Sequence, residues 1–192
     1  LNDYQDTIIR ERTWNFLQSS SYVPHTPDIW RQAVDITWEI DTVLAKAEAL
    51  MAWIYENFKY DPDSTKVSSR VDEVFTLRSG VCQDFTHLQI AALRSLGLPA
   101  KYVSGYLVTH PAPGKPRLIG SDESHAWLSV WLPGIGWVDF DPTNNSMPAH
   151  EHILLAWGRD YGDVSPIKGF IVGGGAHKLD VSVDVAPQAR QT

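Results

Sequence analysis

Apolar residues recur every three or four positions through much of the first half of the chain, which is the spacing of one helix face. This spacing predicts a helix over residues 27–36, with Thr26 as its capping hydroxyl, and a longer helix over residues 43–58 behind Asp41. Each of these helices should bury one side and leave the other in water.

Two further helices are predicted before the middle of the chain. Ser69 and Asp72 have the spacing of a capping box, which indicates a short helix that reaches Leu77. From Cys82 to Leu96 the apolar residues again fall on one helix face. This interpretation puts Cys82 at a helix N-terminus.

The second half of the chain is rich in Val, Tyr and Trp and alternates apolar with polar residues, a pattern typical of strands. Three strands are predicted, over Lys101–Val108, His125–Trp131 and Trp137–Asp141, and the last two are joined by a five-residue turn that contains Pro and Gly. Valines between and beside Ser182 and Asp184 indicate one more strand.

Alternation also predicts which side chains of this hairpin share a face. If Trp131 lies opposite Trp137, then Asp141 lies diagonal to His125 and Asp139 lies one step further away. A β-bulge could shift this register, so the geometry favours Asp141 as the partner of His125 without excluding Asp139.

Length and charge narrow the class of protein. The 192 residues suit one globular domain, and 43% hydrophobic residues with 20% charged residues are unlike a disordered chain. A net charge of −7 argues against nucleic acid or an anionic membrane as a partner. Since no apolar run is long enough to span a bilayer and the polar opening is not a signal peptide, we expect a cytoplasmic protein. Because the chain opens with Leu1 rather than Met, we expect further sequence to precede it in the gene product.

Cys82 is the single cysteine, so the chain can build neither an internal disulfide nor a zinc cluster of thiolates. A free thiol has a pKa of ~8.5, and a helix N-terminus or a nearby imidazolium stabilises the thiolate. Unpaired N–H groups in the first turn of the same helix could bind an oxyanion. The alternative is that Cys82 is a small buried hydrophobic residue, which is the commoner role of a cysteine.

His125 and Asp141 supply what a nucleophilic thiol needs. A carboxylate that holds one ring nitrogen of an imidazole leaves the other nitrogen to exchange a proton with sulfur. Taken singly, His125 is better explained as a structural strand histidine and Asp141 as a turn residue before Pro142.

Four short blocks of sequence, taken together, resemble those of transglutaminase-like proteins. They occur in the family's order at residues 80–85 (GVCQDF), 97–100 (GLPA), 125–127 (HAW) and 136–143 (GWVDFDPT). The resemblance spans about residues 44–145, and residues 153–164 are similar to the bacterial branch often named as cysteine proteases.

The resemblance implies an α+β fold of the papain-like cysteine proteinase or transglutaminase-core type, in which the nucleophile helix packs on an antiparallel β-sheet. It assigns the catalytic triad to Cys82, His125 and Asp141, and it ranks Asp139 lower. It divides the chain into residues 1–20, a remnant of or linker to a preceding β-rich domain, and residues 21–192, the catalytic core with a C-terminal β extension.

Other residues are weaker candidates for the oxyanion site or the cleft. Animal transglutaminases use an upstream Trp beside the oxyanion, and Tyr60 is a weak substitute, with core packing as its alternative. For Asp84 we expect helix capping and for His87 a structural hydrogen bond. Gln83 and Trp127 complete the set.

Two nearby histidines raise the question of a metal site. His150 and His152 have no third ligand at a credible spacing, so we interpret them as solvated loop histidines and expect no metal and no cofactor.

The family resemblance implies acyl transfer on peptide or glutamine amides through a thioester on Cys82, with a peptide or protein as substrate. Family names favour hydrolysis, as in a protease or amidase, over protein cross-linking. The alternative is a non-catalytic peptide-binding or scaffold module, since some relatives have lost the triad. Glycan-amide hydrolysis ranks last because the zinc-binding cysteines of that group are absent. The oligomeric state is not predicted.

Overall fold

A computed structural model describes residues 7–108 and 123–166, with a few isolated positions after them. In the described parts the helices are α1 (Thr7–Thr13), the 3-10 helix η2 (Trp14–Phe16), α2 (Pro27–Thr37), α3 (Val43–Asn57), α4 (Val71–Leu77), α5 (Cys82–Ser95) and α6 (Tyr161–Val164). The strands are β1 (Lys59–Tyr60), β2 (Ser79–Gly80), β3 (Ala100–Leu107), β4 (Glu123–Leu132), β5 (Gly136–Phe140) and β6 (His152–Gly158).

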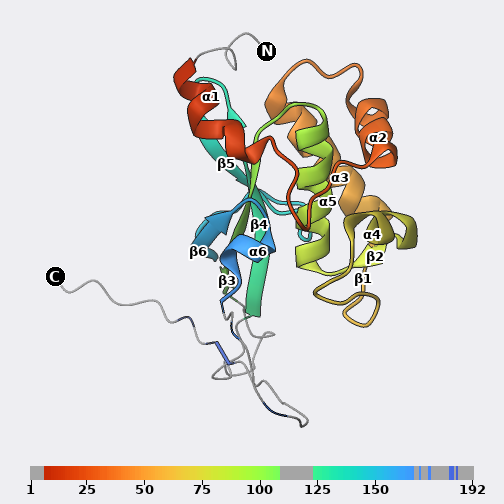
Figure 1. The fold of residues 1–192 in the computed structure, drawn as a ribbon, viewed down its shortest axis with the longest axis vertical. Coiled ribbons are helices and arrows are strands. Elements are labelled where there is room, and N and C mark those ends of the chain that lie inside the picture. Colours follow the sequence, from red (N-terminus) through yellow and green to blue (C-terminus); the bar gives the residue numbers. More distant parts are fainter. Residues whose placement is uncertain are drawn as a thin grey trace, which may run out of the picture.

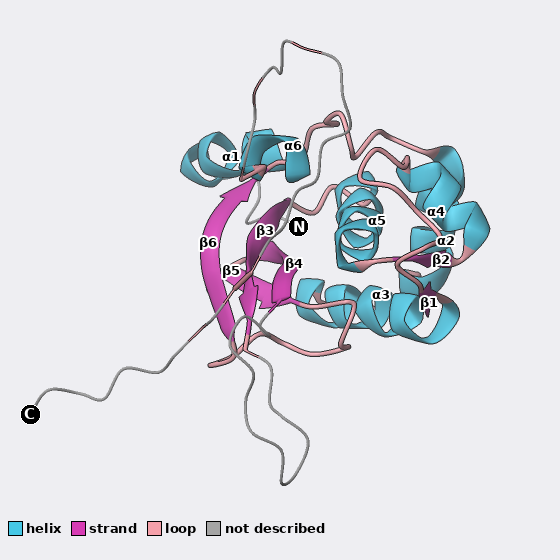
Figure 2. Cartoon of the chain, turned by 90° about the horizontal axis from the view of Figure 1, so that it is seen from below, coloured by secondary structure: helices cyan, strands magenta, loops and turns pink. Residues whose placement is uncertain are grey.

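The molecule has a helical half and a sheet half (Figure 1). Strands β5-β4-β3-β6 form an antiparallel sheet in that order, and β1 and β2 pair as a small parallel sheet. Helix α5 lies between the large sheet and helices α2 and α4 (Figure 2), and it contacts β3 and β4 as well as α2, α3 and α4. The α+β fold with a helix packed on an antiparallel sheet is therefore confirmed.

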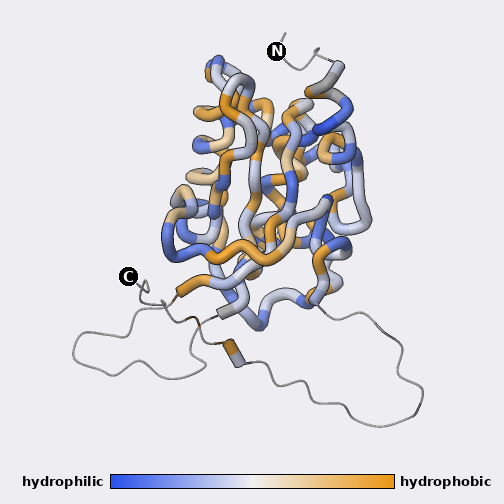
Figure 3. The backbone as a smooth tube through the Cα atoms, turned by 90° about the vertical axis from the view of Figure 1, so that its left-hand side faces the viewer, coloured by the Kyte–Doolittle hydropathy of each residue, from blue (hydrophilic) through white to orange (hydrophobic). Residues whose placement is uncertain are grey.

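The hydrophobic core lies where α5 meets the sheet. Leu88 and Leu93 of α5 and Leu128 and Phe140 of the sheet are all almost fully buried. Hydrophobic and hydrophilic residues alternate along the elements of the body (Figure 3), as expected where each element has one buried side. Among the described residues, no helix is both long and apolar enough to cross a lipid bilayer.

Helices α2 and α3 occur where apolar spacing predicted them, and Thr26 is the N-cap residue of α2 as predicted, but the capping hydrogen bonds differ from those expected. The Thr26 side chain accepts no capping hydrogen bond from α2. At α3, the Thr42 hydroxyl accepts the Ala45 N–H at 3.2 Å, so the cap is Thr42 and not Asp41. A hydroxyl adjacent to the first helical residue reaches the free N–H groups more directly than a carboxylate one residue earlier.

Helix α4 is also present, with a different capping box from the predicted one. Glu73 accepts the Arg70 N–H at 3.1 Å, while the Ser69 hydroxyl accepts the Lys66 N–H in the preceding loop. Asp72 binds the Arg70 guanidinium instead of a backbone group. The helix therefore starts one residue later than the sequence pattern indicated.

The hairpin of β4 and β5 has the predicted register. Trp131 lies opposite Trp137 and Ser129 opposite Asp139. Strand β6 was not predicted, and it pairs with β3 across an irregularity between Ser104 and Gly105. The missed strand matters because its first residue belongs to the candidate site.

Two predictions about the ends of the chain are not tested. Of the strand expected around residues 182–184, Val183 forms an isolated bridge, while residue 184 lies outside the described residues. Residues 7–16 are helical, and the division of the chain at residue 20 stays a prediction.

Candidate active site

Cys82 is the first residue of α5 and is half-buried. The start of the helix is fastened by Asp84, whose Oδ2 accepts the Val81 N–H at 2.9 Å and the Thr65 hydroxyl at 2.6 Å. Burial raises the pKa of the Asp84 carboxyl, against the lowering effect of these two hydrogen bonds. The predicted capping role of Asp84 is confirmed.

The turn before Cys82 is tightly packed against this cap. Gly80 lies in β2, and a β-carbon added there would be 2.8 Å from the Asp84 Cβ, so no larger residue fits without movement. Its carbonyl accepts the Asp61 N–H at 2.9 Å, which fastens β1 beside β2. Tyr60 lies opposite Gly80 in this pair and is 49% exposed, so it lies near the nucleophile helix without being buried.

His125 lies on β4 opposite Gly105 of β3. Its Nε2 is 2.8 Å from the Asp141 Oδ2, and both side chains are buried, 7% and 0% exposed. The Cys82 thiol is near enough to the imidazole to contribute to the rise in its pKa. Since Nε2 is used by Asp141, Nδ1 is the ring nitrogen left for the sulfur.

Asp141 follows β5 in a turn that supplies hydrogen-bond donors to its carboxylate. Its Oδ1 accepts the backbone N–H groups of Thr143 and Asn144 at 2.9 and 3.3 Å, and its Oδ2 accepts the Asn144 side-chain amide at 2.7 Å. Burial acts to raise the pKa of Asp141, but hydrogen bonds with His125, His152 and Asn144 and the His125 charge hold it well below the usual range. The carboxylate is therefore ionised at neutral pH.

The electrostatics of His125 follow from these neighbours. Burial disfavours the imidazolium, but the hydrogen bonds and charges of Asp141 and Cys82 outweigh burial and raise the His125 pKa to about 10. A protonated imidazole thus lies between a sulfur atom and a carboxylate at neutral pH. This is the arrangement in which a thiolate is stabilised.

His152 is a site residue that the sequence interpretation missed. It was expected in a solvated loop, but it opens β6, its side chain is 9% exposed, and its Nε2 is 3.0 Å from the Asp141 Oδ2. Its distance in sequence from residues 125 and 141 hid this contact, because it depends on β6 pairing with β3. His150 is exposed, as predicted.

The same three side chains are the described residues that could hold a metal ion. One donor atom each from His125, Asp141 and His152 lies within 4.8 Å of the others. The premise that His152 lacks potential co-ligands is therefore wrong, while the expectation of no metal stays a prediction. Hydrogen bonds with the shared carboxylate already account for the placement of both rings.

Trp127 bears on whether Asp139 or Asp141 is the partner of His125. Its indole N–H donates to the Asp139 Oδ2 at 3.0 Å, so Asp139 has its own partner on the same sheet face. The Trp127 ring is 1% exposed, and it contacts the His152 ring edge-on at 5.2 Å between centroids. The preference for Asp141 as the His125 partner is thereby confirmed in geometry.

The remaining candidates have structural partners. His87 accepts the Tyr161 N–H at 3.2 Å, as predicted, and burial lowers its pKa to about 3, although the Asp160 charge acts to raise it. The Gln83 side-chain amide donates to the Val67 carbonyl at 3.0 Å, which holds the preceding loop. The roles predicted for these residues, and for Tyr60 and Trp127, at the oxyanion site or the cleft stay predictions.

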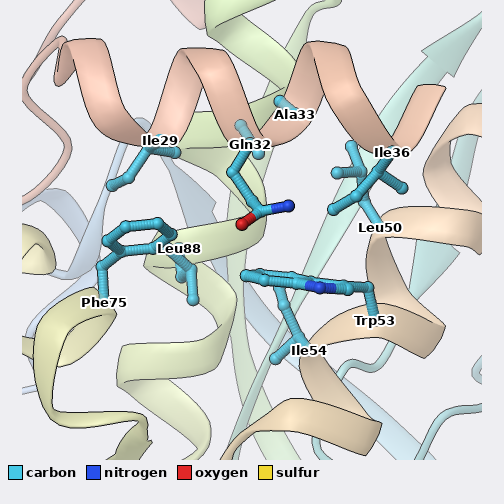
Figure 4. A pocket seen from close by; sticks show the side chains of 10 residues that line it. Ile29, Gln32, Ala33, Ile36, Leu50, Trp53, Ile54, Phe75 and Leu88 are labelled. Carbon is cyan, nitrogen blue, oxygen red and sulfur yellow. The ribbon is translucent and has the colours of Figure 1, made fainter. Parts of the chain in front are cut away.

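A narrow apolar pocket lies elsewhere, among α2, α3, α4 and α5 (Figure 4). Gln32 points into it from α2, with Trp53 of α3 and Phe75 of α4 around it. None of its lining residues is Cys82, His125 or Asp141. We interpret this pocket as a packing gap between helices and not as a substrate site.

Comparison with known proteins agrees with this geometry. A model of the transglutaminase-like superfamily matches residues 31–142, more than half of the chain. The chain belongs to the transglutaminase-like superfamily. Its fold is therefore that of a family of enzymes related to transglutaminases and cysteine proteases.

Individual relatives differ in how they are described. An uncharacterized protein of Mycobacterium tuberculosis is 49% identical over 72% of this chain and 46% of its own length. The protein-glutamine gamma-glutamyltransferase of Pseudomonas aeruginosa is 30% identical over 75% of this chain and 24% of its own. A solved structure described as a candidate cysteine protease, from Cytophaga hutchinsonii, matches with a TM-score of 0.68 and 30% identity over 80% of this chain and 49% of that one. The chain thus spans about half the length of the curated relatives it matches first.

Proposed function

We propose that the chain catalyses acyl transfer from a peptide or glutamine amide, with Cys82 as nucleophile, His125 as general acid and base, and Asp141 as the group that orients His125. The observation that carries this proposal is that the buried His125 ring lies 2.8 Å from the Asp141 carboxylate, while the Cys82 thiol also acts on the same ring. A structural histidine would not need both a buried carboxylate and the single thiol of the chain as partners.

The first half of the reaction forms a thioester. The Cys82 thiolate attacks the amide carbon, and N–H groups in the first turn of α5, which no carbonyl of the helix can reach, stabilise the oxyanion. The His125 imidazolium then gives its proton to the departing nitrogen. The C–N bond breaks, ammonia or an amine leaves, and the acyl group remains on sulfur.

The second half of the reaction releases the acyl group. Neutral His125 takes a proton from water or from a primary amine, which attacks the thioester carbon, and the C–S bond breaks. Water yields a carboxylic acid, whereas an amine yields a new amide, and in either case the sulfur leaves as the thiolate while His125 is again protonated. We propose hydrolysis as the main outcome, in keeping with the description of the Cytophaga hutchinsonii protein.

The experiment uses a glutamine-containing peptide with and without a primary amine. Cys82-dependent release of ammonia with a mass gain of one dalton indicates deamidation, backbone cleavage indicates a protease, and incorporation of the amine indicates a transglutaminase. Cys82→Ala and His125→Ala should each abolish all three products, whereas His150→Ala, an exposed histidine, should leave them unchanged. Product formation that survives Cys82→Ala would contradict the proposal.

A non-catalytic peptide-binding module is the alternative. It needs no activated thiol, so Cys82 should then react slowly and independently of His125. The raised pKa of His125 and its contact with the buried Asp141 carboxylate favour the enzyme.

A further inference from the structure

The Asp141 Oδ2 atom has more hydrogen-bond donors than a carboxylate oxygen ordinarily binds. His125 Nε2 lies at 2.8 Å, His152 Nε2 at 3.0 Å and Asn144 Nδ2 at 2.7 Å. One carboxylate oxygen offers about two lone-pair directions. Three donors must therefore share it, and each one weakens the hold of the others.

His152 is held firmly in this place. It is the first residue of β6, its backbone pairs with Leu107 of β3, and its side chain is 9% exposed. The Trp127 ring packs edge-on against the imidazole at 5.2 Å, with an interplanar angle of 84°. The His125 and His152 ring centroids are 5.8 Å apart.

The hydrogen bond with Asp141 explains why a histidine occupies position 152. Its Nε2 must carry the hydrogen, because the atom facing it is the oxygen of an ionised carboxylate. Its Nδ1 is buried and has no hydrogen-bond partner among the described residues. An imidazole whose other nitrogen is left unpaired gains its polar contact from Asp141 alone, so packing by itself does not explain it.

We propose that His152 is a positioning residue of the site: its Nε2–H orients the Asp141 carboxylate and takes a share of the oxygen that faces His125. In this role His152 acts through Asp141. The catalytic role of His152 rests on the proposed function. The hydrogen bonding among His152, Asp141 and His125 does not depend on it.

The consequence lies in how firmly His125 holds its proton. The titratable groups facing His125 among the described residues are Cys82 from α5, Asp141 after β5 and His152 from β6. Without the His152 donor, Oδ2 has more capacity for the imidazolium, which becomes a weaker acid. A weaker acid protonates the departing nitrogen less readily, so the chemical step slows while substrate binding does not change.

The test compares His152→Phe, which keeps an aromatic ring but has no donor, with His152→Gln, whose amide can still donate to Oδ2. His150→Gln is the matched control, because His150 is exposed. The titration of His125 is followed by NMR of 15N-histidine-labelled protein without substrate. The pH profiles of kcat and kcat/KM are measured on the glutamine peptide.

In His152→Phe the His125 midpoint should rise by about one unit and kcat should fall by about tenfold at unchanged KM. His152→Gln should restore most of both, and His150→Gln should match the wild type. A folded His152→Phe protein whose His125 midpoint is unchanged or lower overturns the proposal. If His152→Phe does not fold, His152→Ala replaces it as the variant without a donor. A His125 midpoint that is equal in His152→Gln and His152→Ala then overturns the proposal.

The two proposals can fail separately. The NMR midpoint needs no substrate, so it tests His152 even if no acyl transfer is found. Acyl transfer that needs Cys82 but ignores the His152 substitutions would uphold the function and reject the positioning role.

Discussion

At the scale of single residues, each ring nitrogen of His125 has its own partner. Nε2 faces Asp141, and the other nitrogen is left for Cys82. Because one partner is a buried carboxylate, the imidazole stays protonated well above neutral pH, with a pKa of about 10. The chemistry of the thiol therefore depends on a residue from a different half of the molecule.

Labelling of Cys82 with iodoacetamide against pH tests this dependence. In the wild type, labelling should persist at pH 6, because the His125 imidazolium stabilises the thiolate. In His125→Ala, the rate at pH 6 should fall by about a hundredfold, since an ordinary thiol is almost wholly protonated there. Equal and slow labelling of both proteins would favour the binding module, and His150→Ala serves as the control.

At the scale of elements, the N-terminus of α5 is held by side chains and not only by its own backbone. Asp84 joins the helix start to the preceding loop through Val81 and Thr65. The sheet supplies the other half of the site from β4, the turn after β5, and β6. Small shifts of either element would separate Cys82 from His125.

Replacing Asp84 with Ala should lower both stability and thiol reactivity. The loss of the cap and of the Thr65 bond should cost about 1–2 kcal/mol of unfolding free energy, measured by urea denaturation. Cys82 labelling at pH 6 should slow as the first turn frays. Glu73→Ala removes the equivalent cap of α4 and is the matched control. It should reduce stability without changing the labelling rate.

At Gly105, the backbone of β3 lies close to both β6 and the Trp127 ring. A β-carbon there would be 2.1 Å from the Ile153 carbonyl oxygen and 2.5 Å from the Trp127 ring. Gly105→Ala should therefore destabilise the protein by about 1–3 kcal/mol and displace His152 from Asp141. Thermal unfolding and the His125 NMR midpoint report the two effects. Gly169→Ala, where nothing lies within 4 Å of the added carbon, should change neither.

At the scale of the whole molecule, the site exists only where the helical half meets the sheet half (Figure 1). Cys82 comes from one half, and His125, Asp141 and His152 come from the other. Folding is thus coupled to the charges of the site, since unfolding returns each group to its ordinary pKa.

The stability of the protein should fall in alkaline solution through His125. The folded-state pKa is raised to about 10 from an unfolded value near 6.5, so its contribution is fully present below about pH 6.5 and is lost as pH rises through 10. The loss should amount to a few kcal/mol, at most ~5, between these limits. Urea denaturation from pH 6.5 to 10 measures it. In His125→Gln this part of the slope should disappear, and an unchanged slope would contradict the coupling.

Asp141 acts at the opposite end of the pH range. Its folded-state pKa is lowered, so its contribution to stability is present above the unfolded value near 3.9 and is lost as pH falls below it. The two ionised partners together give a broad maximum of stability between about pH 4 and about pH 6.5.

The sequence by itself determined the features that depend on near neighbours. Helical spacing located α2, α3 and α5, and the turn between Trp131 and Trp137 set the hairpin register, because each needs only residues close together in the chain. Short blocks around Cys82, His125 and Asp141 were enough to name them as candidates.

Only the tertiary structure decided which distant groups meet. The pairing of β6 with β3 carried His152 to Asp141, and Trp127 bound Asp139, which left Asp141 to His125. The neighbouring groups that raise the pKa of His125 and lower that of Asp141, against the effect of burial, are also brought together by packing. Periodicity along a chain indicates which face of an element is apolar, but burial and hydrogen bonding between elements are set by how those faces pack together.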